Sequence, residues 1–201
     1  PDADVPQEEL PAFAERESLL GARLRLASTF VAWDEEFPNE GHRLDQAAGR
    51  APLIAWDGRR DLRAIASGHW DSLLRERARA CAAFGGLVYV RWGAEFNGEW
   101  NPCYGRAAGF VAAWRHIVSV FRAAGATNVR WVWCPFTVQR PRRGGPDDWR
   151  PYYPGDRFVD WVGMDGYNWG TTRTWSRWQP FAELFGPLYS DYAKRKPLMI
   201  C

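Results

Sequence analysis

The chain has 201 residues, enough for one domain with a substantial core. Its 26 basic residues are balanced by 24 acidic ones, which leaves a formal net charge of only +2. This balance argues against nucleic acid as a partner, because nucleic-acid-binding domains usually carry a clustered basic face; the short run at 140–143 (RPRR) lies beside glycines and a further proline and is interpreted as a solvated loop. No apolar stretch approaches the length of a membrane span, so no membrane partner is predicted.

The order of apolar runs and helix breakers predicts strands that alternate with helices. The expected strands are 24–33, 52–56, 87–92, 129–133, 158–164 and 197–200, and the expected helices are 10–20, 72–84, 107–124 and 178–193. Asp71 is expected to cap the second of these helices. In the third helix, Phe110, Trp114, Ile117, Val118 and Phe121 recur at helical spacing and predict its buried face.

Strands that alternate with helices predict an α/β fold with a parallel sheet. An open doubly wound sheet would normally carry a glycine-rich phosphate loop after an early strand, and the sequence has none. A (β/α)8 TIM barrel fits better, and a complete barrel usually needs about 250 residues. We therefore expect residues 1–201 to form a single, incomplete domain, with the first barrel strand before Pro1 and the last after Cys201.

Polar and aromatic side chains follow three of the expected strands directly. Glu95, Asn97 and Trp100 follow the strand at 87–92, Phe136 follows 129–133, and Asp165, Tyr167 and Trp169 follow 158–164. Because the carboxyl ends of barrel strands meet at one mouth, these side chains are expected to surround a common site.

Glu95 is the candidate proton donor of this site. Glycosidic cleavage needs one carboxylic acid that protonates the leaving oxygen and a second carboxylate that attacks the anomeric carbon or activates water. Glu95 lies between Trp92 and Trp100, and desolvation by indoles raises the pKa of a carboxyl group. The alternative is a surface glutamate that pairs with an arginine such as Arg91. The 31 aromatic residues fit either a large core or a surface for sugar rings, and their number alone does not decide.

Three segments resemble glycoside hydrolase family 26 (GH26), which contains the β-mannanases and some mixed-linkage glucanases and xylanases. Residues 91–100 (RWGAEFNGEW) resemble its acid/base motif. Residues 153–156 (YPGD) with 159–170 (VDWVGMDGYNWG) resemble its sixth-strand signature, and 196–200 (KPLMI) resembles its seventh strand. The resemblance implies strands two to seven of a (β/α)8 barrel and hydrolysis with retention of anomeric configuration.

The resemblance also implies roles for individual residues. Glu95 would be the general acid/base, and Trp100 would stack on a sugar near the cleavage point. Tyr167 would hydrogen-bond the nucleophile beside Asp165, and Trp169 and Phe136 would help to line the cleft. Asn97 is predicted to bind substrate as well. The nucleophilic glutamate would come just after Cys201, outside the sequence.

The predicted function is a retaining endo-β-glycosidase on a β-1,4-linked plant polysaccharide, with β-mannan marginally first. Mannanases of the family commonly carry His immediately before the acid/base glutamate, whereas this chain has Ala94, so mixed-linkage β-glucan and xylan stay open. A non-catalytic carbohydrate-binding barrel is the alternative from another class. Secretion is expected only because such enzymes usually attack insoluble polymers, and the sequence makes no prediction of oligomeric state.

The cysteines and histidines predict no cofactor and no metal site. The four cysteines have no CxxC spacing, and no pair of histidines has metal-ligand spacing. Cys81 is expected in the core. Cys103 and Cys134 could meet at one rim of the barrel, with free thiols favoured over a disulfide. His116 is predicted to be structural, and a sugar-binding role for His69 and Trp70 is the weaker of two interpretations.

Overall fold

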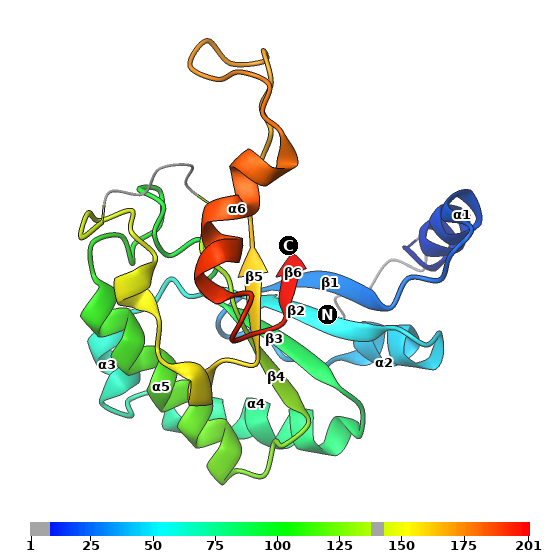
Figure 1. Ribbon diagram of the computed structural model, residues 1–201. Helices are drawn as coiled ribbons and strands as arrows, with labels where there is room; N and C mark the ends of the chain where they lie inside the picture. Colours follow the sequence, from blue (N-terminus) through cyan, green and yellow to red (C-terminus); the bar gives the residue numbers. More distant parts are fainter. Residues whose placement is uncertain (1–8, 138–142) are drawn as a thin grey trace.

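Six parallel strands form the centre of the molecule (Figure 1). This computed structural model describes residues 9–137 and 143–201. The strands pair in chain order and are β1 (Leu26–Val31), β2 (Ala51–Trp56), β3 (Val88–Trp92), β4 (Val129–Trp133), β5 (Trp161–Met164) and β6 (Leu198–Ile200). Every neighbouring pair is parallel, so the predicted α/β fold is confirmed as six strands of a half-barrel.

Helices connect most of the successive strands, whereas the first helix precedes β1 and stands apart from the sheet (Figure 1). They are α1 (Glu9–Leu20), α2 (Glu40–Ala47), α3 (Leu62–Ala66), α4 (Asp71–Phe84), α5 (Ala107–Ala123) and α6 (Phe181–Tyr192), with short 3-10 turns at Arg150–Tyr152 and Asp156–Phe158. Across the described ranges, none of these helices is both long and apolar enough to cross a membrane. Most of the run at 140–143 lies outside the described residues.

Helix α5 carries the buried face that its periodicity predicts. Phe110, Ile117, Val118 and Phe121 are fully buried, and Trp114 is 1% exposed. Each such side chain contributes about 1.5–3 kcal/mol when it is removed from water. This burial, rather than a side-chain cap, holds the helix, because Arg106 at its start makes no capping hydrogen bond.

The tryptophans divide between the core and the surface. Trp33 stacks on Trp56 with 4.7 Å between ring centroids, and Trp92 stacks on Phe110 at 5.3 Å. The most exposed tryptophans of the described residues are Trp100, Trp169, Trp175 and Trp178. The aromatic residues therefore build a large core and also leave several indoles exposed, and a surface for sugar rings stays a prediction.

Asp71 does not cap α4, and that prediction is wrong. Trp70 occupies the N-cap position without a side-chain hydrogen bond, and Asp71 is the first helical residue. The Asp71 carboxylate instead lies 2.6 Å from Nε2 of His116 on α5 and 2.7 Å from Arg75. This link between two helices gives His116 the structural role that was expected of it.

Two short helices were not predicted, α2 and α3. Both are too short or too polar to show an apolar stripe. Their signal is at the start of each helix: Asn39 accepts from the His42 backbone N–H while His42 Nδ1 accepts from the Asn39 N–H, and Asp61 caps α3 by accepting from the Ala64 N–H at 2.8 Å. Such caps satisfy backbone N–H groups that the first turn of a helix leaves free.

Candidate active site

Glu95 lies just beyond the carboxyl end of β3, at the mouth of the half-barrel. Its backbone N–H donates to the carbonyl of Cys134 after β4 at 2.9 Å, which fixes the turn between the two strand ends. Its φ is +59°, the one positive φ of a non-glycine residue among those described. A left-handed conformation costs a side-chain-bearing residue about 1–3 kcal/mol, and such strain clusters at functional sites.

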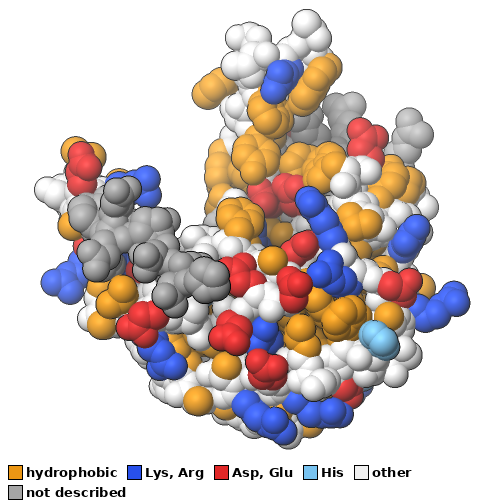
Figure 2. Space-filling view, turned by 180° about the vertical axis from the view of Figure 1, so that it is seen from behind, with side chains coloured by type: hydrophobic (Ala, Val, Ile, Leu, Met, Phe, Trp, Pro, Cys, Tyr) orange, Lys and Arg blue, Asp and Glu red, His pale blue; other side chains and the backbone are white. Residues whose placement is uncertain are grey.

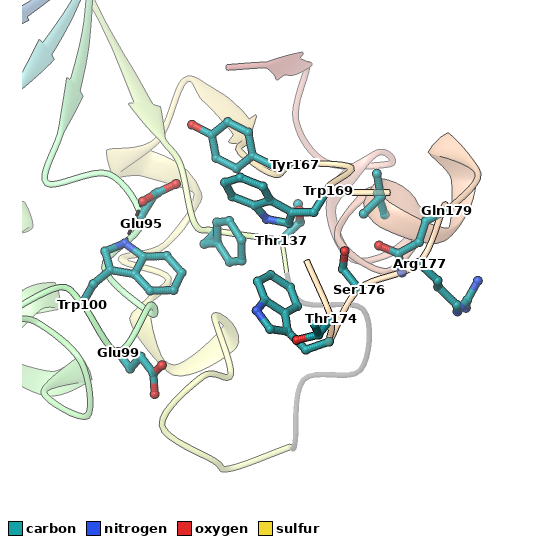
Figure 3. A pocket seen from close by; sticks show the side chains of 13 residues that line it. Glu95, Glu99, Trp100, Thr137, Tyr167, Trp169, Thr174, Ser176, Arg177 and Gln179 are labelled. Carbon is teal, nitrogen blue, oxygen red and sulfur yellow. Dashed lines mark hydrogen bonds between the residues drawn. The ribbon is translucent and has the colours of Figure 1, made fainter. Parts of the chain in front are cut away.

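The indole of Trp100 orients the Glu95 carboxyl group. Its Nε1–H donates to Glu95 Oε2 at 2.8 Å (Figure 3). Burial raises the pKa of Glu95 above its ordinary value; the Trp100 hydrogen bond opposes this rise, and the charge of the nearby Asp165 carboxylate adds to it. The resulting group retains its proton to a higher pH than a solvated glutamate, as a proton donor must.

Arg91 and Asp165 form a buried ion pair beneath Glu95. The Arg91 Nη1 lies 3.2 Å from Asp165 Oδ2, and the two residues are 6% and 7% exposed. Burial raises the pKa of Asp165, although Arg91 opposes the rise. Arg91 therefore pairs with Asp165 inside the barrel. The alternative, in which Glu95 is a surface residue that pairs with Arg91, is wrong.

Tyr167 and Trp169 extend from the end of β5 over the same mouth (Figure 3). Tyr167 is 55% exposed, and the negative charge of Asp165, then burial and the charge of Glu95, raise the pKa of its phenol. The Tyr167 and Trp169 ring centroids are 5.4 Å apart. Phe136, after β4, meets the Trp100 ring edge to face at 4.9 Å.

Asn97 is buried and lines neither cavity at the mouth, so the structure gives no support to the prediction that it binds substrate. The side chain is 1% exposed. Its Nδ2 donates to the carbonyls of Phe136 and Asp147, each at 3.0 Å, and its Oδ1 accepts from the Phe136 N–H at 2.8 Å. All of these partners are backbone groups, so Asn97 joins the loop after β3 to the segments after β4.

Two cavities meet at this constellation. The larger has a volume of about 1000 Å³ and extends toward α6, and the smaller, of about 610 Å³, extends over β1 and β2. Glu95, Trp100 and Tyr167 line both. Ligand sites commonly occupy about 300–1,000 Å³, so the cleft has room on both sides of Glu95.

Several lining residues were not predicted from the sequence. The larger cavity also has Glu99, Trp175 and Ser176 in its wall, and the smaller has Asp57 and Arg59. Glu99 and Asp57 follow β3 and β2 and could have been found by the same strand-end argument, whereas only the excess of tryptophan hinted at Trp175. His69 and Trp70 line neither cavity; Trp70 packs against Trp33 at 5.7 Å.

The cysteines are free thiols in the part of the chain that the structure describes, as favoured from the sequence. Cys81 is fully buried in the core. Cys134 does not pair with Cys103; a Cβ at Gly163 would meet the sulfurs of Cys134 and Cys201, at 2.7 and 2.9 Å. Cys201 lines the smaller cavity together with Glu95 and Asp165, so β6 leads toward the same mouth. A glutamate just after Cys201 remains a prediction.

No group of three or more histidine, cysteine or acidic side chains could hold a metal ion within 9–137 and 143–201. On the face shown in Figure 2, basic and acidic side chains are interspersed rather than gathered by sign. Parallel strands whose carboxyl ends carry a desolvated glutamate, a buried ion pair and exposed indoles form the mouth of a (β/α)-barrel, the place where barrel enzymes have their active sites.

Comparison with known proteins agrees with this class. No family model matches the chain. Endoglucanase H of Acetivibrio thermocellus is 34% identical over 196 residues, and the β-1,3-xylanase TXYA of a Vibrio species is 27% identical over 125 residues. These matches cover 92% and 57% of this chain. The chain spans only 21% and 25% of the length of these two relatives.

Solved structures share the fold. GH26A from Muricauda sp. MAR_2010_75 superposes with a TM-score of 0.64 and 18% identity over 94% of this chain and 71% of its own. A GH26 β-mannanase from Bacteroides ovatus superposes with a TM-score of 0.61 and 16% identity, over 87% of this chain and 61% of its own. The Bacillus subtilis mannanase BCman also superposes with a TM-score of 0.61 and 16% identity, over 94% of this chain and 74% of its own. The predicted resemblance to glycoside hydrolase family 26 is therefore confirmed: the chain has the fold of these GH26 barrels and matches them over part of their length.

Proposed function

We propose that this chain supplies the acid/base side of the active site of a retaining endo-β-glycosidase. The observation that carries the proposal is the desolvated Glu95, oriented by Trp100 in the middle of a cleft with room on both sides. A cleft that is open on both sides of the acid accommodates a polymer that is cut internally.

In the first step Glu95 would donate its proton to the glycosidic oxygen as that bond breaks and the second carboxylate bonds to the anomeric carbon, which gives a glycosyl-enzyme that water attacks in the second step. The Trp100 hydrogen bond holds one carboxyl oxygen, Oε2, which leaves Oε1 free to face the leaving group. In the second step the ionised Glu95 would accept a proton from the attacking water. The same Trp100 N–H then stabilises the carboxylate, so this donor serves the half of the cycle in which Glu95 is charged.

The nucleophile is proposed to be a glutamate just after Cys201, at the carboxyl end of β6. Retaining enzymes hold their two carboxyl groups about 5–5.5 Å apart. Cys201, Glu95 and Asp165 line one cavity, which is compatible with such a separation. Asp165 is a poor substitute because Arg91 already occupies its Oδ2.

For the substrate we propose a β-linked glucan ahead of β-mannan and xylan. Ala94 stands where mannanases of the family commonly carry His, and the 34% identical relative is named an endoglucanase. The two mannanase structures are each 16% identical to this chain and support the fold alone. Export from the cell is proposed too, since polymeric polysaccharides do not enter cells intact.

The test is release of reducing sugar from mixed-linkage β-glucan, galactomannan and xylan by the full-length gene product, beside its Glu95→Gln variant. We expect the fastest release from β-glucan and its loss in the variant. Fastest release from galactomannan would restore the mannan prediction. Binding of a polymer without release, equal in both proteins, would contradict catalysis and favour a carbohydrate-binding barrel.

A further inference from the structure

The segment between β5 and α6, residues 168–180, projects from the barrel as a loop (Figure 1). Hydrogen bonds within the loop define its conformation. Asn168 Nδ2 donates to the Gln179 carbonyl at 2.8 Å, Asn168 Oδ1 accepts from the Gly170 N–H at 3.2 Å, and Ser176 Oγ donates to the Gly170 carbonyl at 2.5 Å. The loop can therefore present its side chains in fixed positions.

Two tryptophans on this loop are almost equally exposed. Trp175 is 72% and Trp178 is 74% exposed. Hydrophobic side chains also gather on the projecting part of the molecule in Figure 2. Contiguous apolar surface of this kind usually marks a place where a ligand or partner binds.

The two side chains differ in what they face. Trp175 lines the larger cavity, the one that contains Glu95, whereas Trp178 does not. The Trp178 ring instead lies over Gly170, 3.4 Å from the position that a Cβ would take there. Only Trp175 therefore belongs to the cleft.

Trp175 is the far end of a series of rings that begins beside Glu95. The Tyr167 and Trp169 centroids are 5.4 Å apart, and those of Trp169 and Trp175 are 6.2 Å apart. Thr174 and Ser176 flank Trp175 in the cavity wall and lie across the cavity from Trp100 and Glu99 (Figure 3). An apolar ring face next to hydroxyl groups is the surface that a sugar ring, apolar on its face and hydroxylated at its edge, would contact.

We propose that Trp175 is a distal sugar-binding platform that holds a residue of the polysaccharide chain beyond those at the reaction centre. The proposal rests on the proposed function for the identity of the ligand and adds a chain-length preference to it. Short oligosaccharides that do not extend to Trp175 gain nothing from it, whereas longer chains bind more tightly and are cut more efficiently.

The test compares wild type, Trp175→Ala and the matched control Trp178→Ala in the full-length gene product. It uses a graded series of oligosaccharides of whichever polymer the wild type cleaves or binds, and measures kcat/KM for hydrolysis and Kd by calorimetry. For the long members we expect Trp175→Ala to lower kcat/KM about tenfold, which corresponds to about 1.4 kcal/mol. The shortest members and the Trp178→Ala control should change less than about twofold.

Each outcome separates this proposal from the proposed function. Hydrolysis without a length-dependent effect of Trp175→Ala, or an equal effect of Trp178→Ala, overturns the platform and leaves the glycosidase intact. Binding that depends on Trp175 and on length, without hydrolysis, supports the platform and overturns the catalytic proposal. The absence of both binding and hydrolysis across the series overturns both. Equal melting temperatures of the three proteins would exclude a folding defect as the cause of any loss.

Discussion

Replacement of Asn97 by alanine tests the claim that this residue belongs to the scaffold. The substitution removes three partly buried hydrogen bonds and leaves the Phe136 N–H and the carbonyls of Phe136 and Asp147 without their Asn97 partner. At about 1 kcal/mol for each bond, the free energy of unfolding should fall by about 3 kcal/mol. In a chain of this size that loss lowers the melting temperature by about 6–12 °C.

Thermal and urea unfolding would measure this loss, and Asn128→Ala is the matched control. Asn128 Nδ2 donates to the carbonyls of Cys81 and Gly86, at the end of the barrel away from Glu95, so its loss should cost about 2 kcal/mol without touching the cleft. Asn97→Ala should also lower kcat, because Phe136 loses its anchor, whereas Asn128→Ala should not. Unchanged stability with a raised KM for Asn97→Ala would refute the scaffold role and restore substrate binding.

Three further substitutions probe the charges around Glu95. Trp100→Phe removes the N–H that lowers the pKa of Glu95, so the alkaline limb of the pH profile of kcat/KM should move to higher pH; a shift to lower pH would contradict the assigned bond. Asp165→Asn removes a negative charge that raises the pKa of Glu95, so the same limb should move to lower pH, and the unpaired Arg91 should cost about 3–5 kcal/mol in unfolding experiments. Glu95→Gln should be more stable than wild type at neutral pH. Because the pKa of Glu95 is raised in the folded state, its ionisation destabilises the folded protein. This cost is absent below the pKa of the unfolded state, about 4, and grows as the pH rises through the pKa of the folded state. The urea midpoint of the variant should therefore exceed that of wild type at neutral pH, and the two midpoints should become equal below pH about 4.

The barrel strands could be predicted because their signal is local. Strands β3 and β4 are apolar on both faces apart from one arginine each, as is typical of parallel strands covered on both sides, and their bounds match the prediction within one residue. The strand expected at 158–164 is shorter, since Asp156–Phe158 forms a 3-10 turn and β5 begins at Trp161. That boundary depends on a contact distant in sequence: the Asp160 carboxylate accepts from the Trp131 N–H at 2.8 Å.

The site was predictable to the extent that its residues follow strand ends. Glu95, Trp100, Phe136 and Tyr167 line one cavity, as the strand-end argument requires. The direction of a side chain was not predictable: Asn97 is only two residues from Glu95 and is also polar, yet its side chain points to the backbone of another loop. Trp175 was missed because it lies in a long loop well after the end of β5, and only the folded structure shows that this loop returns to the cleft.

The most direct measurement of the central claim is the dependence of Glu95→Ala on the leaving group. In the full-length gene product, an acid/base role predicts a loss of about 10²–10⁴-fold in kcat/KM on the polysaccharide, where the leaving sugar needs a proton. An aryl glycoside with an acidic phenol as leaving group should be attacked at nearly the wild-type rate, and azide should restore turnover with a glycosyl azide of retained configuration as product. Equal losses on both substrates, with no product from azide, would contradict Glu95 as the proton donor.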